Sequence, residues 1–188
     1  MKKLSLLVVL LLSGITFLAI ADDTKEEAQQ MPPMGPPEQM KESAYLVGTW
    51  DADTKILMDP STDEWTDAKA VSVYEYVAGG ACMQMTYTSS MMGMEFHGVS
   101  MSVYDREMGE WHDTWVDNMS GRISNFTGNF IDGNMVMTGE DIMMGQKTLK
   151  RMTVSDITDT TFNWKMETSY DDGATWSTGM TASYTKRK

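Results

Sequence analysis

Methionine is the residue type with the clearest chemical potential in this sequence, because 20 of the 188 residues are methionine. Thioethers bind Cu(I), and Met91, Met92 and Met94 lie within a few residues of His97, which makes this cluster a candidate copper(I) site. Such a site needs three converging donors, which spacing alone does not provide. Methionine also fills irregular apolar interiors, and we favour that interpretation of the clusters.

Two residue pairs have the spacing of a pocket wall. Met83 and Met85 are two residues apart and therefore share one face of a strand, as do Trp115 and Asp117. An indole beside a carboxylate offers a ligand an apolar surface with a hydrogen-bonding rim. The stretch DNMSG that begins at Asp117 also has the composition of a turn, and we favour the turn.

Glu75 is the candidate anchor for the polar group of a ligand. It alternates with Val71, Val73 and Val77, so it faces the interior if these valines do. A buried carboxylate needs a partner, which Arg151 or Arg122 would provide. If the same face points outward, Glu75 is simply solvated, and the sequence leaves both orientations open.

Patterns typical of nucleophilic catalysis are absent. The sequence contains no Gly-x-Ser-x-Gly, no histidine near its single cysteine, Cys82, and no glycine-rich phosphate loop. Its two histidines, His97 and His112, have no metal-motif spacing. The sequence therefore favours a protein that is not an enzyme, and catalysis by Glu75 and Asp117 is the weakest alternative.

The N-terminus is typical of an export signal. Lys2 and Lys3 precede an apolar run that ends in Ala19-Ile20-Ala21, so we expect cleavage after Ala21 and a periplasmic or extracellular protein. An uncleaved membrane anchor is the alternative, but Ser13, Gly14 and Thr16 weaken it. After cleavage we expect no membrane insertion.

The charge of the chain excludes one class of partner. The formal net charge is −12, and removal of Lys2 and Lys3 makes it more negative. A chain this acidic repels phosphate backbones and anionic membrane surfaces, so we expect no nucleic-acid binding.

Composition divides the chain into three parts: a signal peptide at 1–21, a flexible proline-rich linker at 22–41 and one domain at 42–188. A short helix is predicted over 38–46, with Met40, Ala44 and Val47 on one face. Beyond Gly48, short segments rich in Val, Thr, Tyr, Trp and Met alternate with Gly, Asp and Asn, which is typical of antiparallel strands. The ten predicted strands are 48–58, 70–77, 81–88, 95–105, 110–118, 123–130, 134–140, 147–157, 160–170 and 178–186.

A sheet of this many strands must close or split to protect its edges, and tight turns between neighbours favour closure. The sequence therefore predicts an all-β, antiparallel up-and-down barrel of about eight to ten strands, with a sandwich as the alternative.

The motifs PPEQMKESAYLVGTW (36–50), AGGACMQMTY (78–87), MMGMEFHGVSMSVYD (91–105), WHDTWVDNMSG (111–121) and MVMTGE (135–140) follow one another in a characteristic order. In order and spacing they resemble the bacterial domain-of-unknown-function family fifteen seventy-nine, over about residues 33–188. The resemblance implies a lipocalin-like, calycin-type β-barrel and no established activity.

Gly48-Thr49-Trp50 also resembles the Gly-x-Trp that opens the first strand of lipocalins. That resemblance implies that Trp50 closes one barrel end beneath a basic residue of the last strand, for which Arg187 is the candidate. The related nitrobindin-like haem proteins ligate iron through a late histidine. No histidine follows His112 here, so we expect no haem.

Together these features predict an exported, monomeric barrel that binds a small, mainly apolar molecule, with Glu75, Trp115, Asp117, Met83, Met85 and Arg151 as candidate ligand contacts. No cofactor is predicted. The alternatives are copper(I) binding at the methionine cluster, and a filled barrel that acts through its surface or through the segment 22–41.

Overall fold

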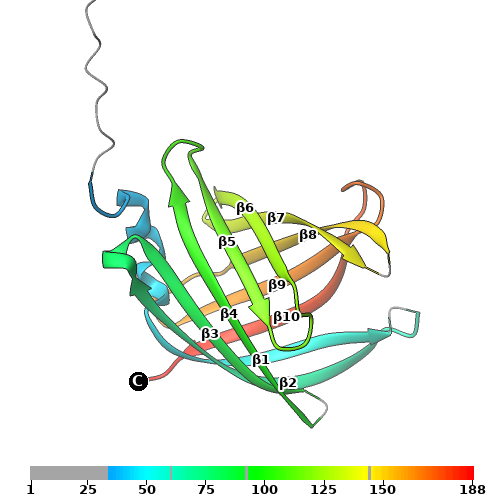
Figure 1. The fold of residues 1–188 in the computed structure, drawn as a ribbon. Coiled ribbons are helices and arrows are strands. Elements are labelled where there is room, and N and C mark those ends of the chain that lie inside the picture. The colour runs from blue at the N-terminus through cyan, green and yellow to red at the C-terminus, as the bar shows by residue number, and fades with distance from the viewer. Residues whose placement is uncertain (1–33, 60, 92, 144) are drawn as a thin grey trace, which may run out of the picture. The chain divides into compact units, whose positions relative to one another are not determined.

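The computed structural model describes residues 34–59, 61–91, 93–143 and 145–188 of the chain. The predicted signal peptide, its cleavage site and the linker up to residue 33 lie outside the described residues. Within them, ten antiparallel strands close into one barrel, in which each strand pairs with its neighbours in sequence and the last pairs with the first (Figure 1). The predicted up-and-down barrel is therefore confirmed.

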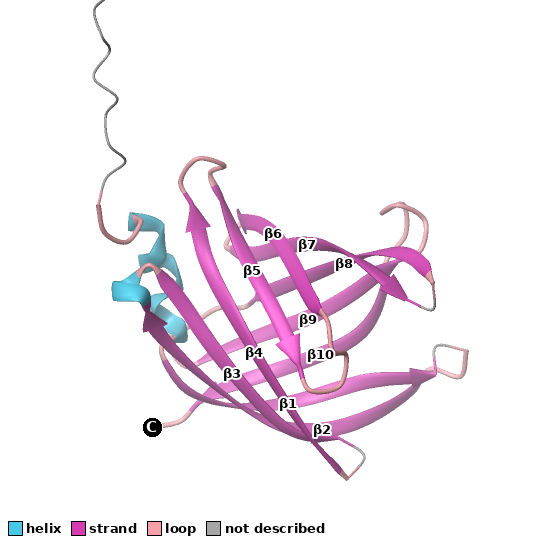
Figure 2. Ribbon diagram, viewed as in Figure 1, coloured by secondary structure: helices cyan, strands magenta, loops and turns pink. Residues whose placement is uncertain are grey.

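The structure contains two short 3₁₀ helices besides the strands, and both lie near the same end of the barrel (Figure 2). The elements are η1 (Glu38–Leu46), β1 (Gly48–Asp59), β2 (Glu64–Val77), η2 (Ala78–Gly80), β3 (Cys82–Met91), β4 (Met94–Asp105), β5 (Glu110–Asp117), β6 (Ile123–Ile131), β7 (Asn134–Met143), β8 (Gln146–Ser155), β9 (Thr161–Ser169) and β10 (Ser177–Lys186).

All ten predicted strands are present, and their ends differ from the prediction by a few residues. The largest difference is in β2, which begins at Glu64 rather than at Ala70. The sandwich alternative is wrong because β1 and β10 pair along most of their length, with Trp50 opposite Lys186 and Ile56 opposite Met180.

The predicted helix over 38–46 is a 3₁₀ helix, and this changes the face that it buries. A 3₁₀ helix has three residues per turn, so residues three apart share a face. Met40 and Ser43 are buried accordingly, whereas Ala44 and Val47, predicted to share the face of Met40, are exposed.

The ordered domain begins earlier than the predicted linker boundary at residue 41. Pro37 and Met40 are buried, and Arg106 donates a hydrogen bond of 2.7 Å to the carbonyl oxygen of Gly35. The segment from about residue 35 therefore packs as part of the barrel domain.

Trp50 closes the barrel end next to η1. Its side chain is fully buried, and its indole N–H donates a 2.6 Å hydrogen bond to the carbonyl oxygen of Leu46. The basic residue above the ring is Lys186, whose Nζ lies 5.2 Å from the ring centroid. Arg187 instead forms an exposed ion pair with Asp51, so its predicted role was wrong.

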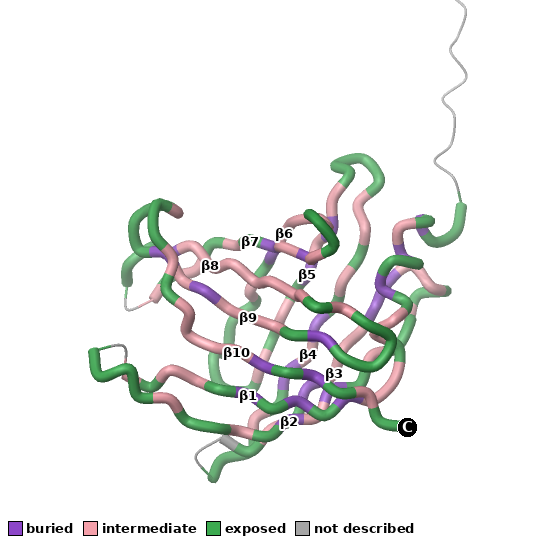
Figure 3. Tube along the Cα trace, turned by 180° about the vertical axis from the view of Figure 1, so that it is seen from behind, coloured by how far each residue is buried: buried purple, intermediate pink, exposed green. Residues whose placement is uncertain are grey.

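The inside and outside of the wall alternate along each strand, as the period of two requires. In β5, Trp111 and Asp113 are buried while Thr114 and Val116 are exposed. Figure 3 marks the buried positions along the strands, and the buried apolar residues form two clusters. One comprises Trp50, Ala52, Ala70, Tyr87, Phe162, Ala182 and Tyr184, and the other comprises Met40, Met83, Trp111, Phe126, Met135 and Met137.

No helix among the described residues has the length and apolar character needed to cross a bilayer.

Candidate functional site

The barrel interior contains a cavity of about 420 Å³. At one end its wall includes Ser43, Tyr45 and Leu46 of η1, so this helix covers that end. At the other end the wall includes Ser120 and Arg122, which are exposed to solvent, so the cavity opens there. A cavity of this size falls within the usual range for small-molecule sites.

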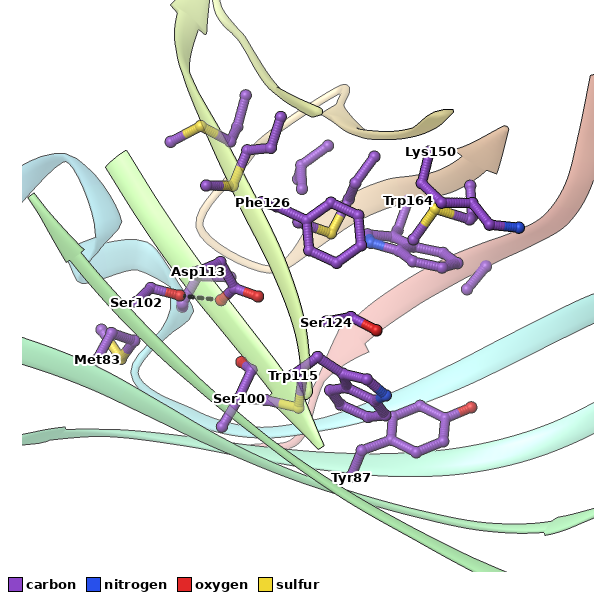
Figure 4. A pocket seen from close by; sticks show the side chains of 18 of the residues that line it. Met83, Tyr87, Ser100, Ser102, Asp113, Trp115, Ser124, Phe126, Lys150 and Trp164 are labelled. Atoms are coloured by element: carbon purple, nitrogen blue, oxygen red, sulfur yellow. Dashed lines mark hydrogen bonds between the residues drawn. The ribbon is translucent and has the colours of Figure 1, made fainter. Parts of the chain in front are cut away.

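Methionine and aromatic side chains make up most of the cavity wall. They come from η1, from β2 and from every strand from β3 to β10, and Figure 4 shows some of them around the cavity. The methionines of the wall are Met83, Met85, Met135, Met137, Met152, Met166 and Met180.

An aromatic group holds the indole of Trp115 in place. Its ring centroid lies 6.1 Å from that of Tyr87, in an edge contact, and 6.3 Å from that of Phe96, in a stacked contact. The indole N–H donates a 2.9 Å hydrogen bond to Asp117, and the ring lies over Gly98, where no side chain obstructs it. Contacts with Tyr87, Phe96 and Asp117 therefore fix the orientation of the Trp115 ring in the cavity wall.

Asp113 is the buried carboxyl group of the cavity. It is 7 % exposed and accepts a short hydrogen bond from the hydroxyl of Ser102, which lies opposite it on β4 (Figure 4). Burial raises the pKa of this carboxyl above its usual range, although the hydroxyls of Ser102 and Ser100 act in the opposite direction.

The open end carries both signs of charge. Arg122 contacts Asp141 at 3.1 Å and donates a 2.7 Å hydrogen bond to the carbonyl oxygen of Ile142, so it links the start of β6 to the end of β7. Lys150 is half-buried and donates a 2.8 Å hydrogen bond to Thr168, and burial lowers the pKa of its ammonium group. Figure 4 shows Lys150 beside Trp164, well away from Asp113.

Two hydroxyl groups in the cavity wall have no hydrogen-bond partner among the described residues. They belong to Thr54, which is 2 % exposed, and Tyr87, which is 6 % exposed. Buried polar groups are rarely left unpaired, because each costs about 1–3 kcal/mol. Both oxygen atoms are themselves buried within the wall.

Four of the predicted ligand contacts line the cavity: Met83, Met85, Trp115 and Asp117. Asp117 belongs both to the cavity wall and to a turn, the two interpretations that the sequence allowed. In the turn after β5 it accepts hydrogen bonds from the backbone N–H groups of Met119 and Ser120. These bonds and the one from Trp115 outweigh partial burial and lower the pKa of Asp117.

Glu75 and Arg151 lie outside the cavity wall. Glu75 is exposed on the outer face of β2, while its neighbours Ala70 and Ser72 of the opposite parity are buried, so the inward orientation was wrong. Arg151 binds Glu167 at 2.9 Å on the outer side of β8 and β9, where the ring of Trp176 lies 4.1 Å from its guanidinium carbon.

The predicted copper cluster lies at the tip of the β3–β4 hairpin. Met92 and the side chain of Met91 are outside the described residues. Met94 is 52 % exposed, and His97 is exposed with its Nε2 3.6 Å from Glu95. Within the described part of the chain, no group of three or more His, Cys, Asp or Glu side chains is arranged to hold a metal ion.

Sequence reasoning missed Asp113, Lys150 and the serines of β4. Asp113 could have been predicted, because it alternates with Trp115 and Asp117 along one strand and therefore shares their face. Ser100, Ser102 and Lys150 carried no such signal, since polar residues at these positions look like solvent-facing ones until the register of the barrel is known.

The barrel and its cavity define a lipocalin-like fold. The chain belongs to the protein family of unknown function DUF1579, whose model matches residues 37–186. Its structure is similar to the S-type phycobiliprotein lyase CPES from Guillardia theta, with TM-score 0.52, 10% identity, and coverage of 79% of this chain and 92% of that one. It is also similar to Rv2717c from M. tuberculosis, with TM-score 0.57, 10% identity, and coverage of 81% and 99%. No curated protein matches the sequence.

Proposed function

We propose that this protein binds a small, mainly apolar molecule inside the barrel. The observation that carries the proposal is the cavity of about 420 Å³, open at one end and walled mainly by methionine and aromatic side chains. Flexible thioethers adapt to ligands of different shape. The barrel fold, shared with a phycobiliprotein lyase, is compatible with this function.

Fluorescence titration of residues 22–188 with N-phenyl-1-naphthylamine tests the proposal, because this neutral apolar dye brightens when it leaves water. We expect saturable binding by the wild type. Ser124→Trp places an indole in the cavity wall beside Trp115, so it should weaken binding by about tenfold, or about 1.4 kcal/mol.

Thr88→Trp is the matched control, because it adds the same side chain to an exposed position on the outer face of β3. It should leave the dye affinity unchanged. Absence of saturable binding by the wild type, or equal affinity in the two variants, would contradict binding inside the barrel.

We further propose that the protein acts outside the cytoplasm after its signal peptide is removed. Lys2 and Lys3, the apolar run and Ala19-Ile20-Ala21 support this proposal. Intact-mass analysis of the full chain, expressed in a bacterium and recovered from the periplasmic and culture fractions, should give a mature protein that begins at Asp22. Recovery of the uncleaved chain in the cytoplasm alone would refute it.

A further inference from the structure

Asp113 is the most deeply buried charged group on the cavity wall, and it has no cationic partner among the described residues. Its contacts are the hydroxyls of Ser100 and Ser102. Tyr74 of β2 and Cys82 of β3, on strands further round the barrel, interact electrostatically with it, and both are neutral at physiological pH. An ionised carboxylate in these surroundings lacks a counter-ion.

Aromatic residues flank Asp113 on its own strand and on the next one. Trp111 and Trp115 lie two residues away on either side along β5 and share its face, and Phe126 lies directly opposite on β6. Aromatic faces attract cations, and an aromatic cage is a common way to bind a substituted ammonium group. A carboxylate in a cavity lined by aromatic residues matches a positively charged group that carries apolar substituents.

We propose that Asp113 binds the ammonium group of a lipophilic amine, whose apolar part occupies the methionine-lined remainder of the cavity. This inference rests on the proposed function and names its ligand class. The ammonium group would supply the counter-ion that the structure does not provide, through a charge-assisted hydrogen bond to the carboxylate. The hydroxyl of Ser102 would continue to donate to the same carboxyl group.

The charge of the protein favours an amine over an anion. The chain carries a formal net charge of −12, although at the open end Glu140 and Asp141 lie beside Arg122 and Lys150 and the local charges balance. The net negative charge attracts cations toward the protein and repels carboxylates. The competing anchor is Lys150, which would bind an anionic head group, but Lys150 is less buried than Asp113 and already donates to Thr168.

Three probes of equal chain length test the proposal: octylamine, octanol and octanoate, each displacing N-phenyl-1-naphthylamine from residues 22–188. We expect octylamine to bind about tenfold more tightly than octanol, and octanoate to bind most weakly. Equal or tighter binding of octanoate would overturn the amine assignment and move the polar contact to Lys150. Failure of the dye and all three probes to bind would instead overturn the proposed function itself.

Asp113→Asn keeps the shape of the side chain and removes its charge. It should abolish the preference for octylamine while leaving octanol affinity within about twofold of wild type. Glu75→Gln is the control, because it removes one negative charge from the outer face of β2 and should preserve the preference. Retention of the amine preference in Asp113→Asn would overturn the proposal.

The wild type provides a second test that does not depend on the folding of any variant. Burial raises the pKa of Asp113 in the empty cavity, and a bound ammonium group would lower it, so amine binding displaces a proton. Octylamine affinity should therefore rise with pH as Asp113 loses its proton and then level off, as long as the amine stays mainly protonated. Octanol affinity should stay constant, and parallel pH curves for the two probes would contradict the assignment.

Discussion

Replacing Trp50 by alanine is expected to lower the free energy of unfolding by about 3–5 kcal/mol, the range measured for large aromatic residues in protein cores. The side chain is completely buried, and its ring lies 4.8 Å from that of Phe162 in an edge contact. Its N–H also holds the last residue of η1 through the carbonyl oxygen of Leu46. The substitution therefore leaves a hole at the closed end of the barrel and releases the helix that covers it.

Urea unfolding followed by circular dichroism measures this effect. Trp65→Ala is the control for loss of an indole, because Trp65 is only partly buried and bonds to the exposed carboxylate of Asp63. We expect the control to cost much less. A loss below about 1 kcal/mol in Trp50→Ala would show that Trp50 does not hold the barrel closed.

Urea unfolding also tests whether Lys186 or Arg187 stabilises the barrel end at Trp50. Lys186→Met should cost about 1 kcal/mol, because it removes the cation over the ring and the 2.9 Å hydrogen bond to the carbonyl oxygen of Tyr45. Arg187→Met should cost less, since its ion pair with Asp51 is exposed on both sides. The opposite order would support the assignment that the sequence predicted.

The strands and their closure could be predicted because both depend on local signals. Turn residues mark the ends of each strand, and the number of strands makes an open sheet unfavourable. The identity of the residue above Trp50 could not be predicted in the same way. Inner and outer faces alternate with every residue, so a register shift of one position exchanges Lys186 for Arg187.

The orientation of Glu75, which the sequence left open, could not be predicted for a different physical reason. Apolar residues usually mark the inner face of a strand, but this barrel carries β-branched residues on its outer face as well. The ladder places Val73, Thr86, Val99, Val116 and Ile123 in one row across β2 to β6, and Val73, Val116 and Ile123 are 39 %, 43 % and 67 % exposed. The inner face of these strands holds Ser72, Ser100, Ser102 and Asp113 among its methionine and aromatic residues.

The polar residues on the inner face belong to the cavity and explain why only part of the candidate site could be predicted. A solid core needs apolar residues on its inner face, whereas a binding cavity tolerates polar groups that a ligand can satisfy. Trp115 and the methionines could be identified as candidates by residue type. The polar residues of β4 and β5 could be assigned to the cavity only from the pairing register of the strands.

Replacing Gly98 by alanine is expected to lower the free energy of unfolding by about 1–3 kcal/mol and to weaken dye binding as well. A Cβ atom at this position would lie 2.0 Å from Cη2 of Trp115, so the indole must move. Its movement breaks the hydrogen bond to Asp117 and turns the ring into the cavity, where it competes with the ligand.

Gly179→Ala is the matched control, because no atom lies within 4 Å of its added Cβ and its backbone is not in the left-handed region. It should stay within about 0.5 kcal/mol of wild type and bind the dye normally. The double variant Gly98→Ala/Trp115→Leu should be more stable than the sum of the two single effects predicts, because removal of the indole makes room for the new methyl group. Additive effects, or equal losses in the two glycine variants, would show that Gly98 does not position Trp115 in the cavity wall.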